Sequence, residues 1–213
     1  MTTRLASTRF RLAGVAALAA CALTLSACQG GGTPGNTGTT TASVTPSATP
    51  TPTPTPIAVY KPADAKGKAQ NVPVPVKPAL ADENSKAGLE AFTKYWFALL
   101  NYGFETGDSS AWEKLIQPGC LFCENLKSTI ETGYKLDRWQ AGGRISAPII
   151  DATVAEGAPT QQVMVQVIQE TTDFYKADGS IGRAPEPASN TASVVIASYK
   201  DGAWIVSDMH LVQ

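Results

Sequence analysis

Residues 191–212 have the sequence TASVVIASYKDGAWIVSDMHLV, in which two apolar runs are separated by an Asp-Gly pair at 201–202. Asp-Gly between two such runs is the strongest short-range sign of a β-hairpin, because its backbone readily adopts the turn that matches the twist of the strands. A two-residue loop fixes the register of this hairpin and places Val195 opposite Asp208. The chain is therefore expected to contain an antiparallel sheet.

Two further extended and β-branched stretches precede the hairpin, at residues 144–155 and 161–175. Gly157 and Pro159 mark the turn between them, and residues 177–189 are rich in Gly and Pro and are expected to form a loop. The second half of the domain therefore predicts a four-stranded antiparallel meander.

The residues before the strands show helical periodicity. Asp82 and Asn84 are candidate N-caps of a first helix, whose apolar side chains recur every three or four residues at Leu89, Phe92, Trp96 and Leu99. A capping box at Ser110 and Glu113 opens a short second helix, and residues 120–136 predict a third. Residues 82–213 are therefore expected to form one α+β domain, with three N-terminal helices packed on a curved antiparallel sheet.

The charges and composition of the chain exclude several classes of function. Its 213 residues contain 17 Lys and Arg against 18 Asp and Glu, and one His. Residues 82–213 alone carry a net charge of −7, from 10 basic and 17 acidic side chains. Nucleic acid requires clustered Lys and Arg, so it is not an expected partner. One His and no glycine-rich phosphate loop argue against most hydrolases, kinases and zinc enzymes, and no cofactor or metal is expected.

Residues 1–27 have the organisation of an export signal. Three arginines precede a run of 13 apolar residues at 12–24, which is too short to span a membrane comfortably as a helix. The sequence LSAC at 25–28 resembles the bacterial lipoprotein signal, which implies cleavage before Cys28 and a diacylglycerol on its thiol. LAAC at 18–21 is a second match, but cleavage there would leave a very short apolar segment. An uncleaved signal anchor, or a secreted protein with an incidental Cys28, is the alternative.

Residues 28–81 are expected to be the lipid anchor followed by a disordered tether. Residues 29–81 contain 10 Pro, 10 Thr and 6 Gly with Tyr60 as the one aromatic residue, so they cannot bury enough apolar surface to fold. The Thr-Pro repeat at 49–56 favours polyproline II, and the whole tether would reach up to about 160 Å.

Taken together, these features resemble a known kind of protein. Helices followed by a curved antiparallel sheet look like the nuclear transport factor 2-like cone fold. The chain is also similar to an uncharacterised family of actinobacterial-type lipoproteins, through its lipoprotein signal, its tether, Tyr95-Trp96-Phe97, the turn at 105–108, Cys120-x-x-Cys123 and the Trp204 hairpin. The resemblance covers about residues 80–213 and implies a fold and a membrane location, but no activity.

Cys120 and Cys123 lie at positions i and i+3 at the start of the third expected helix. With Cys28 lipidated they are the only two thiols of the mature chain, and in an oxidising exterior they are expected to form a structural disulfide. A redox-active pair is the alternative, since a helix N-terminus lowers the pKa of a thiol. A metal site would need His210 and a carboxylate as further ligands, and no spacing supports one.

Asp208 and His210 are candidates for a proton-transfer pair, because residues two apart in a strand project from one face. Here that face would also carry Trp204 and Val206. Cone-fold enzymes such as ketosteroid isomerase use a carboxylate in an apolar cavity, where loss of water tunes its pKa. The apolar residues on the other side of this strand make that side the better core candidate, so a solvent-facing or structural role is preferred.

Trp96, Trp112 and Trp204 complete the candidate pocket, although aromatic residues at helical spacing more often belong to a core. The favoured function is a lipid-anchored binding or protein-interaction module at the extracytoplasmic face of the bacterial cell membrane. The alternatives are a small-molecule binder or a lyase or isomerase with an open cone, and a thiol–disulfide protein. The expected partners are the membrane, through Cys28, and an envelope protein or a small ligand.

Overall fold

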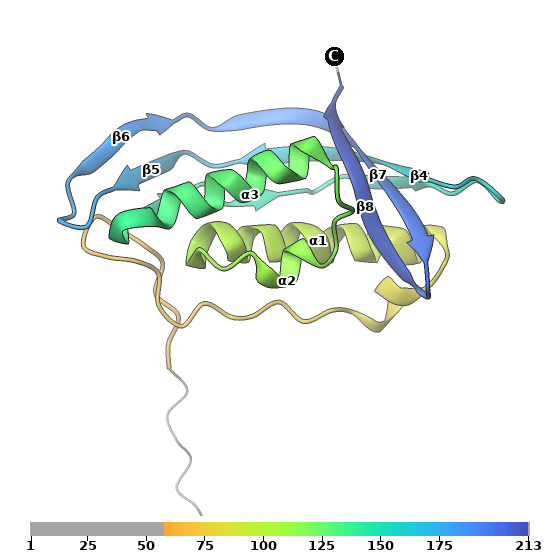
Figure 1. Ribbon diagram of the computed structural model, residues 1–213, viewed down its shortest axis with the longest axis horizontal. Helices are drawn as coiled ribbons and strands as arrows, with labels where there is room; N and C mark the ends of the chain where they lie inside the picture. Colours follow the sequence, from red (N-terminus) through yellow and green to blue (C-terminus); the bar gives the residue numbers. More distant parts are fainter. Residues whose placement is uncertain (1–57, 213) are drawn as a thin grey trace, which may run out of the picture. The chain divides into compact units, whose positions relative to one another are not determined.

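Helices precede strands along the chain, so the expected α+β class is confirmed (Figure 1). The structure is a computed structural model and describes residues 58–212. Its helical elements are the 3-10 helix η1 (Ala79–Asp82), α1 (Lys86–Thr106), α2 (Ser110–Glu113), α3 (Leu121–Tyr134) and the 3-10 helix η2 (Lys135–Asp137). The expected signal peptide, Cys28 and the Thr-Pro repeat lie outside the described residues. Within residues 58–212 no helix is both long and apolar enough to cross a membrane.

The ends of α1 are set by residues whose chemistry suits a helix terminus. Ser85 is the N-cap, in place of the expected Asp82 or Asn84, and its hydroxyl accepts a hydrogen bond of 3.0 Å from the Gly88 N–H. Gly107 ends the helix with φ of +82°, a left-handed conformation that glycine adopts at little cost.

The second expected helix is a single turn, which corrects the prediction of three helices on the sheet. After Glu113 the chain makes a turn at Lys114 and Leu115 and then bonds to a strand at Val206, whose N–H donates to Leu115 O at 2.9 Å and whose carbonyl accepts from Gln117 N–H at 2.7 Å. These backbone bonds compete with the i+4 bonds of a helix. Of the helices within residues 58–212, α1 and α3 are therefore the two that are long enough to cover the strands.

Within residues 58–212, eight strands form two antiparallel sheets where one meander of four strands was expected. They are β1 (Trp139–Gly142), β2 (Ile145–Ser146), β3 (Ile150–Thr153), β4 (Gln161–Gln169), β5 (Thr172–Tyr175), β6 (Ile181–Glu186), β7 (Ser189–Lys200) and β8 (Ala203–Leu211). The first sheet has the order β1-β5-β6. The second has the order β2-β4-β7-β8, with β3 also paired to β4.

Three long extended segments each contribute one strand to both sheets, with their breaks at residues 143–144, 170–171 and 187–188. The expected strand 161–175 is thus β4 and β5, and the expected loop 177–189 contains β6. Gly142 has φ of +73°, and a Cβ there would lie 2.4 Å from the carbonyl oxygen of Thr171 in the facing segment. Figure 1 shows β6 leading into β7 and β5 leading away from β4 at this bend.

The hairpin quoted at the outset is present as β7 and β8, and its register follows the expectation from the turn as far as Ala197, which faces Val206. Beyond this point Ser207 is an extra residue in β8, so that Val195 faces Met209 and not the expected Asp208. An extra residue shifts the alternation of side chains by one, and everything beyond it in β8 changes face.

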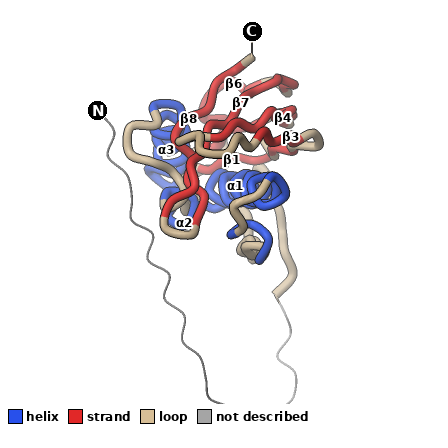
Figure 2. Tube along the Cα trace, turned by 90° about the vertical axis from the view of Figure 1, so that its right-hand side faces the viewer, coloured by secondary structure: helices blue, strands red, loops and turns tan. Residues whose placement is uncertain are grey.

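Both long helices lie on the same side of the strands, and the core fills the space between the two layers (Figure 2). Trp96 and Trp112 are in contact there, with ring centroids 5.3 Å apart. The largest side chains with less than 2% exposure are Trp96, Trp112, Trp204, Phe92, Leu89, Leu99, Leu100 and Ile130. These side chains therefore fill the space between the helices and the strands around Trp96 and Trp112.

Residues 58–78, here called the strap, run along α1, whereas composition predicted a disordered tether as far as residue 81 (Figure 1). The strap folds back on itself through backbone hydrogen bonds of 3.0 and 2.9 Å between Lys61 and Gln70. The indole N–H of Trp139 donates to Asp64 O at 2.8 Å. The folded domain therefore begins by residue 58.

The segment that follows the strap, η1 and Glu83, is bonded to the β7–β8 hairpin. The hydroxyl of Tyr199 donates to Asp82 O at 2.7 Å, and the indole N–H of Trp204 donates to Glu83 O at 2.8 Å. Ala81, between these contacts, is fully buried. Two side chains of the hairpin thus bond to backbone carbonyl groups at the end of η1.

Candidate functional site

The three tryptophans of the candidate pocket are core residues, the alternative that the sequence favoured for them. Trp96, Trp112 and Trp204 are at most 1% exposed, and none of them lines the pockets described below. These large apolar side chains fill the space between the helices and the sheet, so they do not line a cavity there.

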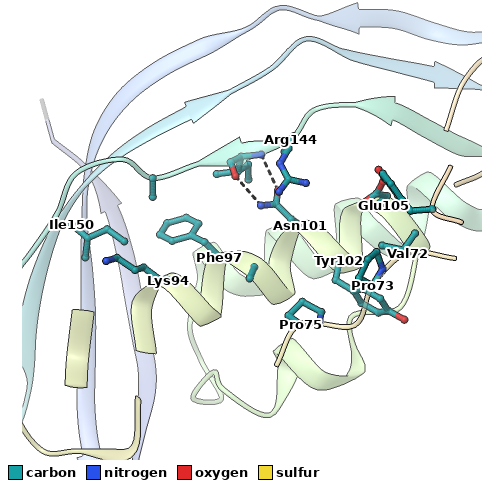
Figure 3. A pocket seen from close by; sticks show the side chains of 14 residues that line it. Val72, Pro73, Pro75, Lys94, Phe97, Asn101, Tyr102, Glu105, Arg144 and Ile150 are labelled. Carbon is teal, nitrogen blue, oxygen red and sulfur yellow. Dashed lines mark hydrogen bonds between the residues drawn. The ribbon is translucent and has the colours of Figure 1, made fainter. Parts of the chain in front are cut away.

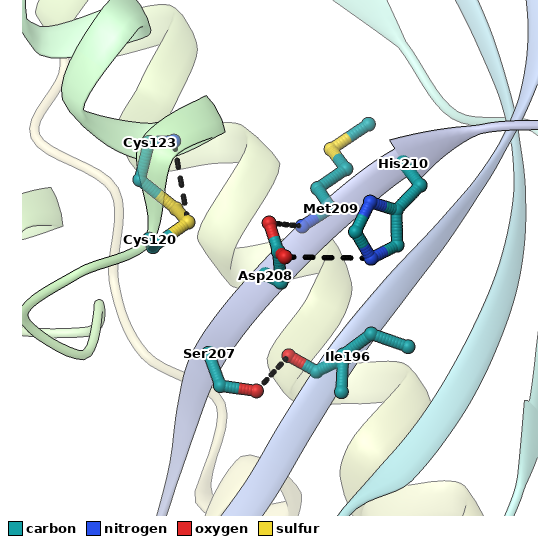
Figure 4. Close-up of a disulfide and its surroundings, with 7 residues drawn as sticks. All are labelled: Cys120, Cys123, Ile196, Ser207, Asp208, Met209 and His210. Atoms are coloured by element: carbon teal, nitrogen blue, oxygen red, sulfur yellow. Dashed lines mark hydrogen bonds and ion pairs between the residues drawn. A yellow bond between two sulfur atoms is a disulfide. The ribbon is translucent and has the colours of Figure 1, made fainter.

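Asp208 and His210 do share a face of β8, but it is the face turned away from the helices (Figure 4). The carboxylate of Asp208 lies 3.4 Å from His210 Nε2 and accepts a hydrogen bond of 2.8 Å from the Met209 N–H. Their side chains are 40% and 60% exposed, respectively. The bulge at Ser207 separates them from Trp204 and Val206, with which they were expected to share a face.

Cys120 and Cys123 form the expected disulfide at the start of α3 (Figure 4). Both residues are at most 1% exposed. The sulfur of Cys120 also accepts a hydrogen bond of 3.2 Å from the Cys123 N–H and so caps the helix. This position and burial fit a structural cross-link.

A pocket of about 260 Å³, here called the inner pocket, opens between the helices and the second sheet. It is lined by residues of α1, α3, β2, β4, β7 and β8, namely Phe97, Leu100, Phe122, Leu126, Ile145, Val167, Gln169, Ser189, Thr191, Ser193, Met209 and Leu211. None of these side chains is titratable at ordinary pH. The pocket can hold an apolar group but offers no charge and no acid or base.

Ser193 is the buried polar residue of the inner pocket. Alternate residues of β7 face the helices, which places Ser193 between Thr191 and Val195 on the inner side. Ser193 is 0% exposed, and its hydroxyl has no hydrogen-bond partner among the described residues. Most buried hydroxyls in folded proteins are bonded, so this group requires an explanation.

A second hollow of about 380 Å³, the outer groove, lies between the strap and α1 (Figure 3). Val72 and Pro73 of the strap form one wall, and Phe97 and Tyr102 of α1 belong to the other. Its central polar residue is Asn101, whose amide exchanges two hydrogen bonds of 2.8 Å with the backbone of Ile145. Both groups of the Asn101 amide are therefore used in holding β2 to α1.

Charged groups surround the outer groove at its rim. Lys94, Glu105 and Arg144 line it, and the hydroxyl of Tyr60 donates to the carboxylate of Glu105. Partial burial, and then this bond to a carboxylate, raise the pKa of Tyr60 to about 12. The tyrosine therefore stays neutral at physiological pH and fastens the strap to the end of α1.

Sequence reasoning missed Ser193, although a signal for it was present. In the quoted strand the inward positions Thr191, Ser193, Val195 and Ala197 alternate with outward ones, so a small polar residue at an inward position could be identified from the hairpin register alone. The cavity beside it could not, because its walls come from six separate elements.

Three solved structures are similar to the chain at low identity. The intermembrane space region of the chloroplast protein ARC6 is 7% identical, with a TM-score of 0.44, over 61% of this chain and 98% of its own. An uncharacterised protein with a cystatin-like fold from Caulobacter vibrioides is 15% identical, with a TM-score of 0.37, over 57% of this chain and 84% of its own. A putative calcium/calmodulin dependent protein kinase II association domain from Xanthomonas campestris is 12% identical, with a TM-score of 0.34, over 63% and 91%.

These similarities are too weak to carry an argument about function, and no curated protein matches the chain. A family of unknown function, DUF6318, matches residues 58–210. The matched region begins where the strap begins and includes both sheets and all the helices described above. Since it covers well over half of the chain, the protein belongs to this family of unknown function.

Proposed function

We propose that this protein is a lipid-anchored binding module on the extracytoplasmic side of a bacterial cell membrane. The LSAC sequence at 25–28 supports the anchor at Cys28, and the Cys120–Cys123 disulfide supports an oxidising compartment, because cytosolic proteins rarely keep such a bond. In this proposal the domain is a variant of the nuclear transport factor 2-like cone in an actinobacterial-type lipoprotein, and it holds its ligand in the inner pocket.

The observation that carries the binding function is the chemical character of the inner pocket. It is an apolar recess with a small number of polar groups, which is the usual composition of small-molecule sites. General acid–base catalysis needs a titratable group within hydrogen-bond reach of the substrate, and none lines this pocket. Asp208 and His210, the candidates for that role, face the opposite side of the sheet. The pocket therefore favours binding over a lyase or isomerase reaction.

The disulfide does not favour a thiol–disulfide function either. Redox-active cysteines are exposed to their partners, whereas Cys120 and Cys123 are at most 1% exposed. A structural role for this bond agrees with its place at the junction between the α2 region and α3.

The anchor is tested by replacing the lipidated residue. Cys28→Ala is expected to move the protein from the membrane fraction to the soluble fraction, or to leave it unprocessed, because the variant lacks the thiol that carries the diacylglycerol. The two acyl chains of that group hold a protein on a membrane far more firmly than one chain does. Cys21→Ala is the matched control and should leave the protein lipidated and in the membrane fraction. Intact mass and fractionation measure both. Membrane retention of the Cys28 variant with loss of the Cys21 variant would contradict the assignment.

The binding function is tested with benzene, since an engineered apolar cavity of about 150 Å³ is known to hold it. Methionine methyl NMR suits the test, because the chain has three methionines, of which Met209 lines the pocket and Met164 lies exposed on β4. Benzene added to the purified protein is expected to shift the Met209 methyl signal saturably and to leave that of Met164 in place.

Two phenylalanine variants make this result specific to the pocket. Thr191→Phe fills the recess and should abolish the Met209 shift, whereas Asn190→Phe points out from the other face of β7 and should preserve it. Equal shifts at both methionines, or a shift that survives Thr191→Phe, would overturn the proposed site.

A further inference from the structure

The inner pocket contains one buried polar side-chain atom that has no hydrogen-bond partner among the described residues. Ser193 pairs through its backbone with Val165 of β4 and Leu211 of β8, so its N–H and carbonyl are used within the sheet. Its hydroxyl, by contrast, has no partner in residues 58–212 and is shielded from solvent. A buried hydroxyl that is left unbonded destabilises the fold, and one that meets a partner on ligand binding strengthens the complex.

Burial without a partner is not by itself enough to mark a site, and β7 provides the comparison. Ser198, on the same strand, is also buried with an unbonded hydroxyl, but it does not line the inner pocket. Ser193 combines both conditions, an unbonded hydroxyl and a recess next to it. No other buried polar side-chain atom without a partner among the described residues belongs to this pocket.

The volume and the lining of the pocket limit what can bind there. A recess of about 260 Å³ is larger than the roughly 150 Å³ that accommodates benzene, so it has room for a single ring with a small substituent. A charged ligand would lose its hydration without meeting an opposite charge, because no ionised side chain lines the pocket. An uncharged ligand avoids this cost.

We propose that the inner pocket binds a small uncharged ring compound that carries one hydrogen-bonding group, and that Ser193 recognises this group. The inference deepens the proposed binding function and rests on it. The apolar residues Leu100, Phe122 and Met209 surround the ring, and the Ser193 hydroxyl bonds the substituent, because a serine hydroxyl can donate as well as accept.

The test compares phenol with toluene, which are nearly the same size and differ in a hydroxyl against a methyl group. Dissociation constants are measured from the shift of the Met209 methyl signal in the wild type and in Ser193→Ala. The ratio of the toluene to the phenol dissociation constant is expected to fall by about threefold to tenfold in Ser193→Ala, the range that one neutral hydrogen bond contributes. Ser198→Ala is the matched control and should leave the ratio unchanged.

The outcomes separate this inference from the proposed function. If both probes shift Met209 and the ratio is the same in Ser193→Ala as in the wild type, the role of Ser193 is overturned while the pocket remains a binding site. If neither phenol, toluene nor benzene shifts Met209 in the wild type, the proposed pocket itself is overturned. Thermal unfolding of both serine variants checks that they fold, which is expected because alanine is smaller and removes an unsatisfied hydroxyl.

Discussion

At the scale of single residues, Glu113 links the short helix α2 to α3. The hydroxyl of Ser109 donates to one of its oxygens, and Lys127 Nζ donates to the other at 2.7 Å. The bond from Lys127, followed by the bond from Ser109, holds the pKa of the Glu113 carboxyl below its ordinary range against the opposing effect of burial. The carboxylate therefore favours the folded state only while it is ionised.

This contact predicts a dependence of stability on pH. A lowered pKa gives stability that is present above the unfolded-state pKa of about 4.3 and is lost as pH falls through the lower folded-state value. The difference in unfolding free energy between the wild type and Glu113→Gln should be full at pH 7 and should shrink at pH values below about 4. Thermal or urea unfolding at several pH values measures it.

Glu156→Gln is the control for this measurement, because Glu156 is exposed in the loop between β3 and β4 and no ion pair or side-chain hydrogen bond of it occurs within residues 58–212. Its unfolding free energy should follow that of the wild type across the same range. A Glu113→Gln effect that stays constant down to pH 3 would show that the side chain acts through packing and not through its charge.

Another single residue explains the main error of the sequence analysis. The hairpin turn and the first paired residues follow from Asp201-Gly202, because turn chemistry is local. The bulge at Ser207 has no such local sign, and it exchanges the faces of all residues that follow it in β8. Met209 therefore enters the inner pocket, and Asp208 and His210 leave it.

At the scale of elements, α1 could be predicted well because its apolar period is a property of its own sequence. Its cap was misplaced by one to three residues, since Asp82, Asn84 and Ser85 are all good capping residues and only the tertiary contacts of η1 select among them. The length of α2 was overestimated because the residues after it pair with Val206, ninety positions away in the chain.

The bend between the two sheets was not predictable from the strand that contains it. Residues 161–175 include no Gly or Pro and are rich in β-branched residues, so they suggest one long strand. The signal lies in the facing segment, where Gly142 and Gly143 adopt positive φ values of +73° and +69°. A break imposed by a neighbouring strand cannot be recognised until the pairing is known.

At the scale of the whole molecule, the strap changes where the domain begins. Its composition suggested disorder because it has few apolar residues of its own. Composition cannot reveal that Asp64 accepts a hydrogen bond from Trp139, or that Lys68 pairs with Asp137. Each partner is about 70 residues away in the sequence. The folded part of the chain is therefore longer than periodicity and composition predict.

Removing the strap tests this reading of the domain. A chain that begins at residue 82 is expected to have a lower melting temperature than one that begins at residue 58, because it loses the bonds to Trp139 and Glu105 and the burial of Ala81. Each 1 kcal/mol lost lowers the melting temperature by about 2–4 °C in a domain of this size. Equal melting temperatures would show that the strap does not contribute to the stability of the domain.

The strap also determines how the domain would respond to mechanical load. A pull on the chain before residue 58 arrives first at Tyr60, whose hydroxyl is bonded to Glu105 of α1, and then at the paired segment from Lys61 to Gln70. The helices and the sheets carry the full load only after this bond and the contacts of Asp64 with Trp139 and of Lys68 with Asp137 have broken. Extended to about 3.4 Å per residue, residues 58–81 add roughly 80 Å of slack. The strap would therefore lengthen before the rest of the domain unfolds.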